Sequence, residues 1–265
     1  MGHDAAWRTS PLTHWDLVNR IQLQGKPISP LFGAPWVTTA IFRRDWLHAV
    51  DLGVASDFAG NCLRSLTEKF DGRNKRRRVA AVWNDIQAFY VANDVSDRLQ
   101  CLVPTMIQQP KKGPKLRASA AVVRGLVPYL DEAAARLLND ADPVEHAVKT
   151  AANHLHECYR LLRNDAVFAP AGLEHHSIRF CQLYVALSDA HEDPKLWRIK
   201  PKLHVFLELC REDSKPAKFW TYRDEDFGGS VARISRRRGG QVSASAFSKN
   251  VLERFKLKQP IIRIK

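Results

Sequence analysis

Three adjacent carboxylates near the C-terminus are the residues of this sequence best suited to chemistry. The carboxylates of Asp224, Glu225 and Asp226 repel one another unless cations neutralise them. Arg223 precedes the triplet and Arg233 follows it. Carboxylate oxygens of this kind bind hard cations such as Mg²⁺. The same crowding is also common in the first turn of a helix, where it offsets the macrodipole. Residue types leave both interpretations open, and the helix start is the more ordinary one.

A further carboxylate lies beside a histidine in the stretch Asp45-Trp46-Leu47-His48. The two side chains are three residues apart, so a helix would place them on one face. This spacing suits two groups that share a ligand. It equally suits an aspartate that caps a helix N-terminus, followed by a half-buried histidine. Both alternatives stay open, and the structural one is the more common.

Several common enzyme signatures are missing from the sequence. It contains no HExxH, no Gly-rich phosphate loop and no GxSxG, which excludes the usual zincin, P-loop and serine hydrolase classes. Its five cysteines are at least 23 residues apart, so there is no CxxC zinc knuckle. We expect reduced thiols in a nuclear or cytoplasmic protein that is not secreted and binds no small-molecule cofactor.

Clusters of Lys and Arg indicate a polyanionic partner, and DNA is the first candidate. The chain carries 41 Lys and Arg against 28 Asp and Glu, a net charge of +13. Residues 216–265 hold twelve Lys or Arg against four Asp or Glu and so contribute +8. Phosphate contacts, which position a nucleic acid without reading its bases, are expected from Arg76, Arg77, Arg78, Lys111, Lys112, Arg236, Arg237 and Arg238.

Two aromatic residues stand among these basic residues. Trp220 and Tyr222 alternate with Lys218 and Arg223, an arrangement that suits stacking on an unpaired base. Aromatic residues at the edge of an element are more often part of the core. No stretch of the chain approaches the about 18 consecutive apolar residues of a spanning helix, so we expect no membrane association.

These residues must be positioned mainly by helices, because apolar residues recur at three- and four-residue spacing through the middle of the chain. Asp142 and Pro143 predict an N-cap and a first turn. The one clear strand candidate is Val37–Phe42, which is short and β-branched. Helices are expected over about 15–23, from 47 to 66, after 72 through 90, and over about 118–139, 143–162 and 173–190.

Taken in order, several segments resemble En/Spm-like (CACTA) transposases. Asp45-Trp46-Leu47-His48, with Gly60-Asn61-Cys62-Leu63 after it, is similar to their Asp-x-Met-His segment and following helix. Lys200-Pro-Lys-Leu-His204-Val-Phe-Leu-Glu-Leu209 is similar to their C-terminal histidine segment, and Phe219-Trp-Thr-Tyr-Arg-Asp-Glu225-Asp-Phe-Gly228 to their Trp-x-Tyr-x-x-Glu segment. A closer likeness is to transposon-derived open reading frames of protist genomes.

The resemblance implies an RNase H-like DDE/D nuclease fold interrupted by a helical insertion. Glu225 and Asp45 would be two of its three metal-binding carboxylates, with His48 or His204 orienting a ligating carboxylate. Mg²⁺ would be the cofactor of a competent enzyme. Only 44 Pro-rich residues precede Asp45, with no strand hairpin to carry a first aspartate. Since two-metal catalysis needs converging carboxylates, we expect a fragment or a degenerate copy with little or no activity.

We therefore predict a mainly α protein, a multi-helix bundle with a small, incomplete RNase H-like α/β edge. Its segments would be an irregular N-terminal arm (1–36), the strand and helix of the remnant (37–74), a helical insertion (75–192), a closing segment with the acidic motif (193–238) and a basic tail (239–265). The leading hypothesis for function is a transposase-derived nucleic-acid-binding protein. The alternatives are a non-catalytic all-α interaction module and, with least support, a small-molecule enzyme.

Overall fold

The computed structural model describes residues 13–34, 37–38, 43–109, 111–163, 165, 167–222, 228–229, 232, 249 and 253. The chain is mainly helical, as predicted. Within the described residues there is no β-strand, and the one β-type pairing is an isolated bridge between Gln108 and Pro114. None of the described helices is both long enough and apolar enough to cross a membrane.

The chain divides into two units, residues 1–44 and 45–265. In the first unit, the helix α2 (His14–Leu23) confirms the predicted short helix and begins with a capping box between Thr13 and Asp16. The single-turn helix η1 (Pro30–Gly33) follows. The predicted strand Val37–Phe42 is not formed at residues 37 and 38, and residues 39–42 lie outside the described part of the chain.

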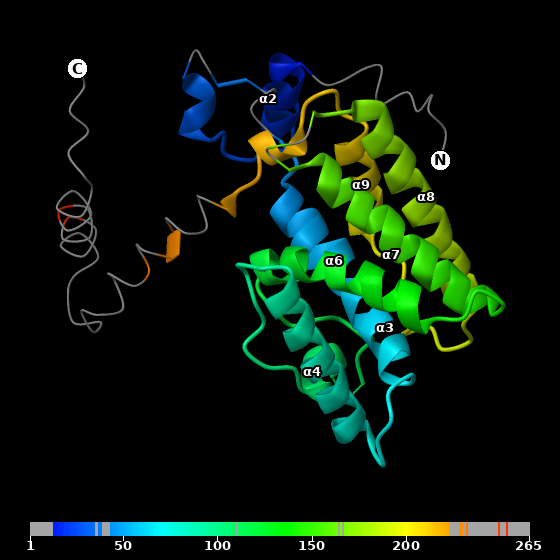
Figure 1. Ribbon diagram of the computed structural model, residues 1–265. Coiled ribbons are helices and arrows are strands. Elements are labelled where there is room, and N and C mark those ends of the chain that lie inside the picture. Colours follow the sequence, from blue (N-terminus) through cyan, green and yellow to red (C-terminus); the bar gives the residue numbers. More distant parts are fainter. Residues whose placement is uncertain are drawn as a thin grey trace. The chain divides into compact units, whose positions relative to one another are not determined.

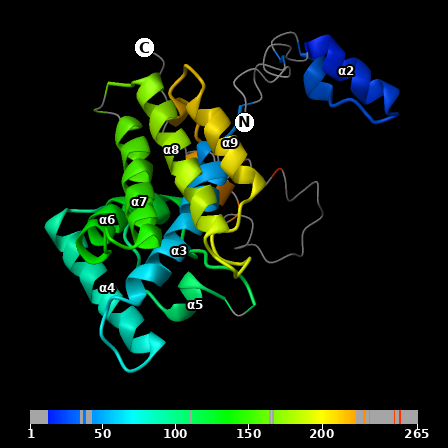
Figure 2. The same cartoon turned by 90° about the vertical axis from the view of Figure 1, so that its right-hand side faces the viewer.

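In the second unit, one long buried helix runs through the middle of the other helices. It begins as the π-helix η3 (Leu47–Ala55) and continues as the α-helix α3 (Ser56–Thr67). Both Figures 1 and 2 show it running through the group, from blue to cyan. The predicted apolar face is confirmed, because each of its positions is at most 4% exposed: Leu47, Val50, Val54, Phe58, Cys62 and Leu66.

Four surrounding helices confirm the predicted ones: α4 (Lys75–Ala92), α6 (Ala120–Leu137), α7 (Pro143–Leu161) and α8 (Pro170–Asp189). Three more were not predicted: α5 (Pro104–Ile107), α9 (Pro201–Cys210) and the short η4 (Pro216–Lys218). Figures 1 and 2 both show α7 and α8 side by side. The pairs α6 with α7, α6 with η3, and α9 with η3 also pack together. Residues from η3 to α9 therefore share one apolar core.

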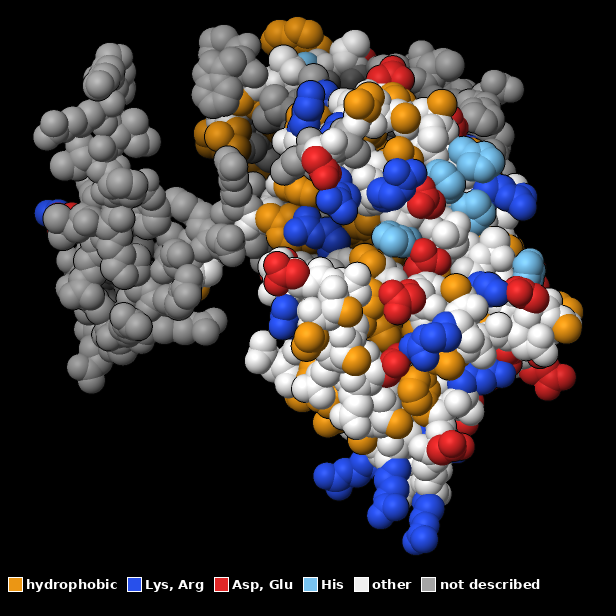
Figure 3. Space-filling view, in the orientation of Figure 1, with side chains coloured by type: hydrophobic (Ala, Val, Ile, Leu, Met, Phe, Trp, Pro, Cys, Tyr) orange, Lys and Arg blue, Asp and Glu red, His pale blue; other side chains and the backbone are white. Residues whose placement is uncertain are grey.

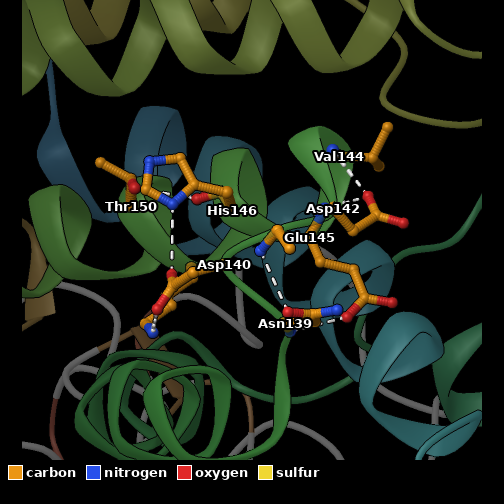
Figure 4. A network of polar contacts seen from close by, with 9 residues as sticks. Asn139, Asp140, Asp142, Val144, Glu145, His146 and Thr150 are labelled. Carbon is orange, nitrogen blue, oxygen red and sulfur yellow. Dashed lines mark hydrogen bonds and ion pairs between the residues drawn. The ribbon is translucent and has the colours of Figure 1, made fainter.

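The start of α7 shows how local sequence sets a helix boundary (Figure 4). As predicted, Asp142 is the N-cap: its Oδ1 accepts hydrogen bonds from the backbone N–H groups of Val144 at 2.8 Å and Glu145 at 3.1 Å. Pro143 follows in the first turn, where its missing N–H leaves no hydrogen bond unmade. The Glu145 carboxylate accepts from the backbone N–H of Asn139 at 2.8 Å, which fixes the chain that enters the helix.

Candidate nucleic-acid interface

Asp45 is the N-terminal cap of the central helix. Its Oδ1 accepts hydrogen bonds from the backbone N–H of Leu47 at 3.2 Å and of Thr221 at 3.0 Å. Its Oδ2 lies 3.0 Å from the backbone nitrogen of His48, 2.9 Å from the Thr221 hydroxyl and 2.5 Å from Nδ1 of His48. Burial acts to raise the pKa of Asp45, but the hydrogen bonds from His48 and Thr221 outweigh burial and hold the pKa below its ordinary value.

The structure confirms the capping role predicted for Asp45, whereas His48, predicted to be half-buried, is exposed. A carboxylate offers about four lone pairs, and five donors already surround Asp45. A metal ion at this carboxylate would have to displace Thr221 or the ring of His48. The predicted contact between His48 and Asp45 is present, and His204 lies half-buried on α9.

The predicted metal partner of Asp45 cannot be placed beside it, because Glu225 lies outside the described residues. The same holds for Arg236, Arg237 and Arg238 of the predicted basic set. Among the residues that are described, no three His, Cys, Asp or Glu side chains are arranged to hold a metal ion. The Mg²⁺ centre therefore stays a prediction of the sequence.

Arg76, Arg77 and Arg78 lie in the first turn of α4, whose N-cap is Asn74. Figure 3 shows Lys and Arg side chains projecting at the lower end of the view, over the start of this helix. Arg78 pairs with Glu68 at 3.1 Å, whereas Arg76 and Arg77 are exposed. Positive charge is unfavourable at this end of a helix dipole, so an anion bound here would relieve a repulsion.

The other predicted pair, Lys111 and Lys112, lines a cavity of about 580 Å³. Five more cationic side chains line the same cavity, against the single carboxylate of Asp57: Lys115, Arg117, Lys195, Arg198 and Lys200. Asn61 of α3 and the buried Tyr184 of α8 add polar groups to the wall. The described residues of the loops 109–117 and 194–200 thus lie together over α3.

The first of these loops is bound directly to the central helix. The backbone N–H of Leu116 donates to the carbonyl of Ser56 at 2.8 Å, and the Ser56 hydroxyl donates back to the Leu116 carbonyl at 2.8 Å. Gly60 permits the crossing, because a Cβ at this position would lie 2.3 Å from the backbone nitrogen of Lys115. The absence of a side chain at Gly60 therefore sets where the lysine-bearing loop lies.

The second loop is tied to the same helix and to the first loop. The backbone N–H of Trp197 donates to Oδ1 of Asn61 at 3.1 Å, and the Trp197 side chain is only 2% exposed. Gly113 packs against the carbonyl of Lys195 so closely that a Cβ would lie 2.3 Å from that oxygen. Two cationic loops that would repel each other are therefore held in contact by backbone packing.

Asp57 neutralises only part of this positive charge. Lys200 Nζ lies 2.7 Å from Oδ2 of Asp57, while Lys115 Nζ lies 4.0 Å from Oδ1, too far for a hydrogen bond. Lys115 instead donates to the carbonyl of Leu52 at 2.8 Å. Burial lowers the pKa of Lys115, and the neighbouring Lys200 and Lys202 lower it further against the opposing effect of Asp57.

No described carboxylate forms an ion pair with the other cations of the cavity. Within the part of the chain that the structure describes, no ion pair is formed by the five exposed ones, which are Lys111, Lys112, Arg117, Lys195 and Arg198. Such a surface attracts a ligand that carries several negative charges. The sequence predicted Lys111 and Lys112 of the first loop but not Lys195 and Arg198, which lie about eighty residues further along the chain. Gly60 permits the close approach of the first loop to α3, and Gly113 permits that of the two loops to each other. A glycine alone does not show which segment packs against it, so these contacts could not be predicted.

Comparison with protein-family models, with curated proteins and with solved structures gives no match for this chain.

Proposed function

We propose that the protein binds nucleic acid through the sugar-phosphate backbone, at the cavity between the loops 109–117 and 194–200. The observation that carries this proposal is the set of five exposed cations without an ion pair among the described residues, next to a single neutralising carboxylate. Lys and Arg that contact phosphates orient a nucleic acid and contribute no base identity. The basic residues of 216–265 would add to this affinity.

Salt dependence tests the proposal. Each phosphate contact releases counterions, so the affinity for duplex DNA should fall steeply as ionic strength rises. Arg198→Gln should weaken binding to all sequences alike and reduce the slope of log affinity against log salt by about 1. Arg179→Gln is the matched control, because Arg179 is also exposed but lies on α8 and outside the cavity. Shallow salt dependence, or equal effects of the two substitutions, would refute the proposal.

The motif order supports a transposase-derived origin of this function, with Asp45 and Glu225 as the remains of a Mg²⁺ centre and an RNase H-like edge as the remains of its fold. The competing candidate is a non-catalytic helical interaction module. The five donors around Asp45 favour that candidate, because they give this carboxylate a structural role. A protein that binds no DNA at low salt would support the module.

A further inference from the structure

A second cavity, of about 750 Å³, lies beside α6 and α7 and shares no described lining residue with the first. Its wall is lined by α6, by the end of α7 and the residues after it, and by the segment 216–222: Arg124, Pro128, His156, Tyr159, Arg160, Leu162, Arg163, Asp165 and Trp220. Figure 3 shows this face, where Lys and Arg side chains lie among apolar atoms near α6 and α7. The volume falls within the roughly 300–1,000 Å³ typical of sites for small organic groups.

The indole of Trp220 is held in a fixed place on this wall. The guanidinium carbon of Arg124 lies 4.9 Å from the ring centroid of Trp220 and 4.7 Å from that of Tyr222. The two rings meet edge to face, with centroids 5.3 Å apart. Tyr222 in turn donates a hydrogen bond to the buried Asp51 at 2.6 Å. The half-buried Trp220 thus presents an ordered aromatic surface to the cavity.

Among the described residues, the ion pairs around this surface leave Arg124 with no carboxylate at ion-pair distance. Arg160 pairs with Glu157 at 2.7 Å, Arg163 with Asp165 at 2.8 Å, and His156 with Asp131 at 2.7 Å. Arg124 forms no ion pair with any described residue, and its charge acts on the buried Asp51. Burial raises the pKa of Asp51 to about 7, so this acid neutralises Arg124 only in part at neutral pH.

We propose that this second cavity binds one unpaired base of a single-stranded nucleic acid, stacked on Trp220, with the adjoining phosphate attracted by Arg124. The inference rests on the proposed function and deepens it, because a duplex keeps its bases paired and cannot fill this cavity. Every base has a π-face, so such a site accepts any sequence. If Trp220 and Arg124 only hold the chain against the core, the cavity has no preference for bases.

The test compares two labelled single strands of about twelve nucleotides, within the usual range of single-strand site sizes. One is oligothymidylate, and the other has the same phosphates with abasic tetrahydrofuran sugars. By fluorescence anisotropy at one fixed salt concentration, the unmodified protein should bind the thymidylate strand about tenfold more tightly, since a stacked base contributes about that factor. Equal affinity for the two strands would overturn the inference.

Substitutions then test whether Trp220 causes the preference for the strand that carries bases. Trp220→Leu should abolish it and leave the affinity for the abasic strand unchanged, whereas Trp220→Phe should keep most of it. Trp15→Leu, at a tryptophan that is 72% exposed, is the matched control and should change neither affinity. A preference that survives Trp220→Leu would place the base elsewhere.

The outcomes separate this inference from the proposed function. If neither strand binds but duplex DNA does, only the base site fails, and if duplex DNA does not bind either, both fail. If both strands bind equally, and a separate salt series shows that their affinity falls steeply with ionic strength, again only the base site fails. The comparison on the unmodified protein decides the question even when the leucine variant does not fold.

Discussion

The hydroxyl of Tyr222 donates a 2.6 Å hydrogen bond to Oδ2 of Asp51, which joins the end of the segment 216–222 to the π-helical turn of the central helix. The Tyr159 hydroxyl donates to the other oxygen of the same carboxyl. Asp51 is 0% exposed. Burial raises its pKa to about 7 against the opposing effect of the two phenols. A single buried acid therefore connects η3, α7 and the segment that carries Trp220.

The stability of the protein should depend on pH through Asp51. The unfolded pKa is near the ordinary value of 3.8 and the folded pKa is about 7, so the folded state binds more protons between these values. Stability from this group is complete below about pH 4 and is lost as pH rises through 7. The free energy of unfolding of the unmodified protein, measured by urea unfolding, should fall by roughly 1–3 kcal/mol between pH 5 and pH 8. In Asp51→Asn this fall should be absent. If the stability of the variant falls equally with pH, another group is responsible for the pH dependence.

Gly60 should be intolerant of any side chain. A Cβ would lie 2.3 Å, 2.4 Å and 2.7 Å from backbone N, Cα and C of Lys115, and backbone cannot move aside cheaply. Gly60→Ala should therefore destabilise by about 1–3 kcal/mol, although alanine is the better helix former. Gly172→Ala in α8 is the control, because its Cβ would meet only side-chain atoms, of Leu161 at 3.4 Å and Ala169 at 3.6 Å, and it should be neutral or stabilising. Equal Tm values for the two variants would contradict the role given to Gly60.

The main helices of the fold were predictable because their stability depends on local signals that repeat along the chain. The face from Leu47 to Leu66 and the Asp142-Pro143 boundary needed no knowledge of the tertiary structure. The strand at Val37–Phe42 was predicted from propensity, which is a weak guide where no pairing partner is known. The π-helical form of η3 carries no periodic signal, since the apolar spacing is the same as for an α-helix.

The site was predictable only in part. Lys111 and Lys112 were identified by their charge, whereas Lys195 and Arg198 join them through contacts between distant loops. Asp51 was missed because a single carboxylate within an apolar helix face has no pattern of its own. Asp45 was singled out correctly as a residue near a helix start. Its bonds to Thr221 could not be foreseen across 176 residues.

The basic residues outside the described part of the chain should contribute affinity without specificity. Arg236, Arg237 and Arg238 changed together to Ala should weaken DNA binding to a similar degree for unrelated sequences, because phosphate contacts carry no base identity. The salt slope should fall by about 3 if each residue contacts one phosphate. The same measurement on a variant with Arg76 and Arg77 changed to Ala compares the contribution of these two residues, at the start of α4, with that of the three C-terminal arginines. Loss of affinity for one sequence alone would show that these residues read bases.

Glu225→Gln is the decisive substitution for the predicted metal centre. Asp45 already accepts hydrogen bonds from five donors, which leaves little of its carboxylate for a metal ion. We therefore expect at most weak cleavage of DNA, dependent on Mg²⁺ or Mn²⁺ and abolished by EDTA. Glu225→Gln removes a negative charge and a ligand while it preserves shape, so it should abolish that cleavage and leave salt-sensitive binding largely intact.

Thr221→Val tests whether Asp45 is a metal ligand or only a helix cap. The substitution removes the hydroxyl that donates to Oδ2 of Asp45 at 2.9 Å. If Asp45 binds a metal ion, freeing one of its lone pairs should raise the Mg²⁺-dependent rate. If Asp45 serves only as a cap, the same change should lower the stability by about 1 kcal/mol and leave the rate at background. Cleavage that continues in Glu225→Gln would remove Glu225 from any catalytic role, because hydrolysis would then proceed without that carboxylate. Cleavage that continues in EDTA would remove the metal centre of Asp45 and Glu225 altogether, because hydrolysis would then proceed without the metal ion.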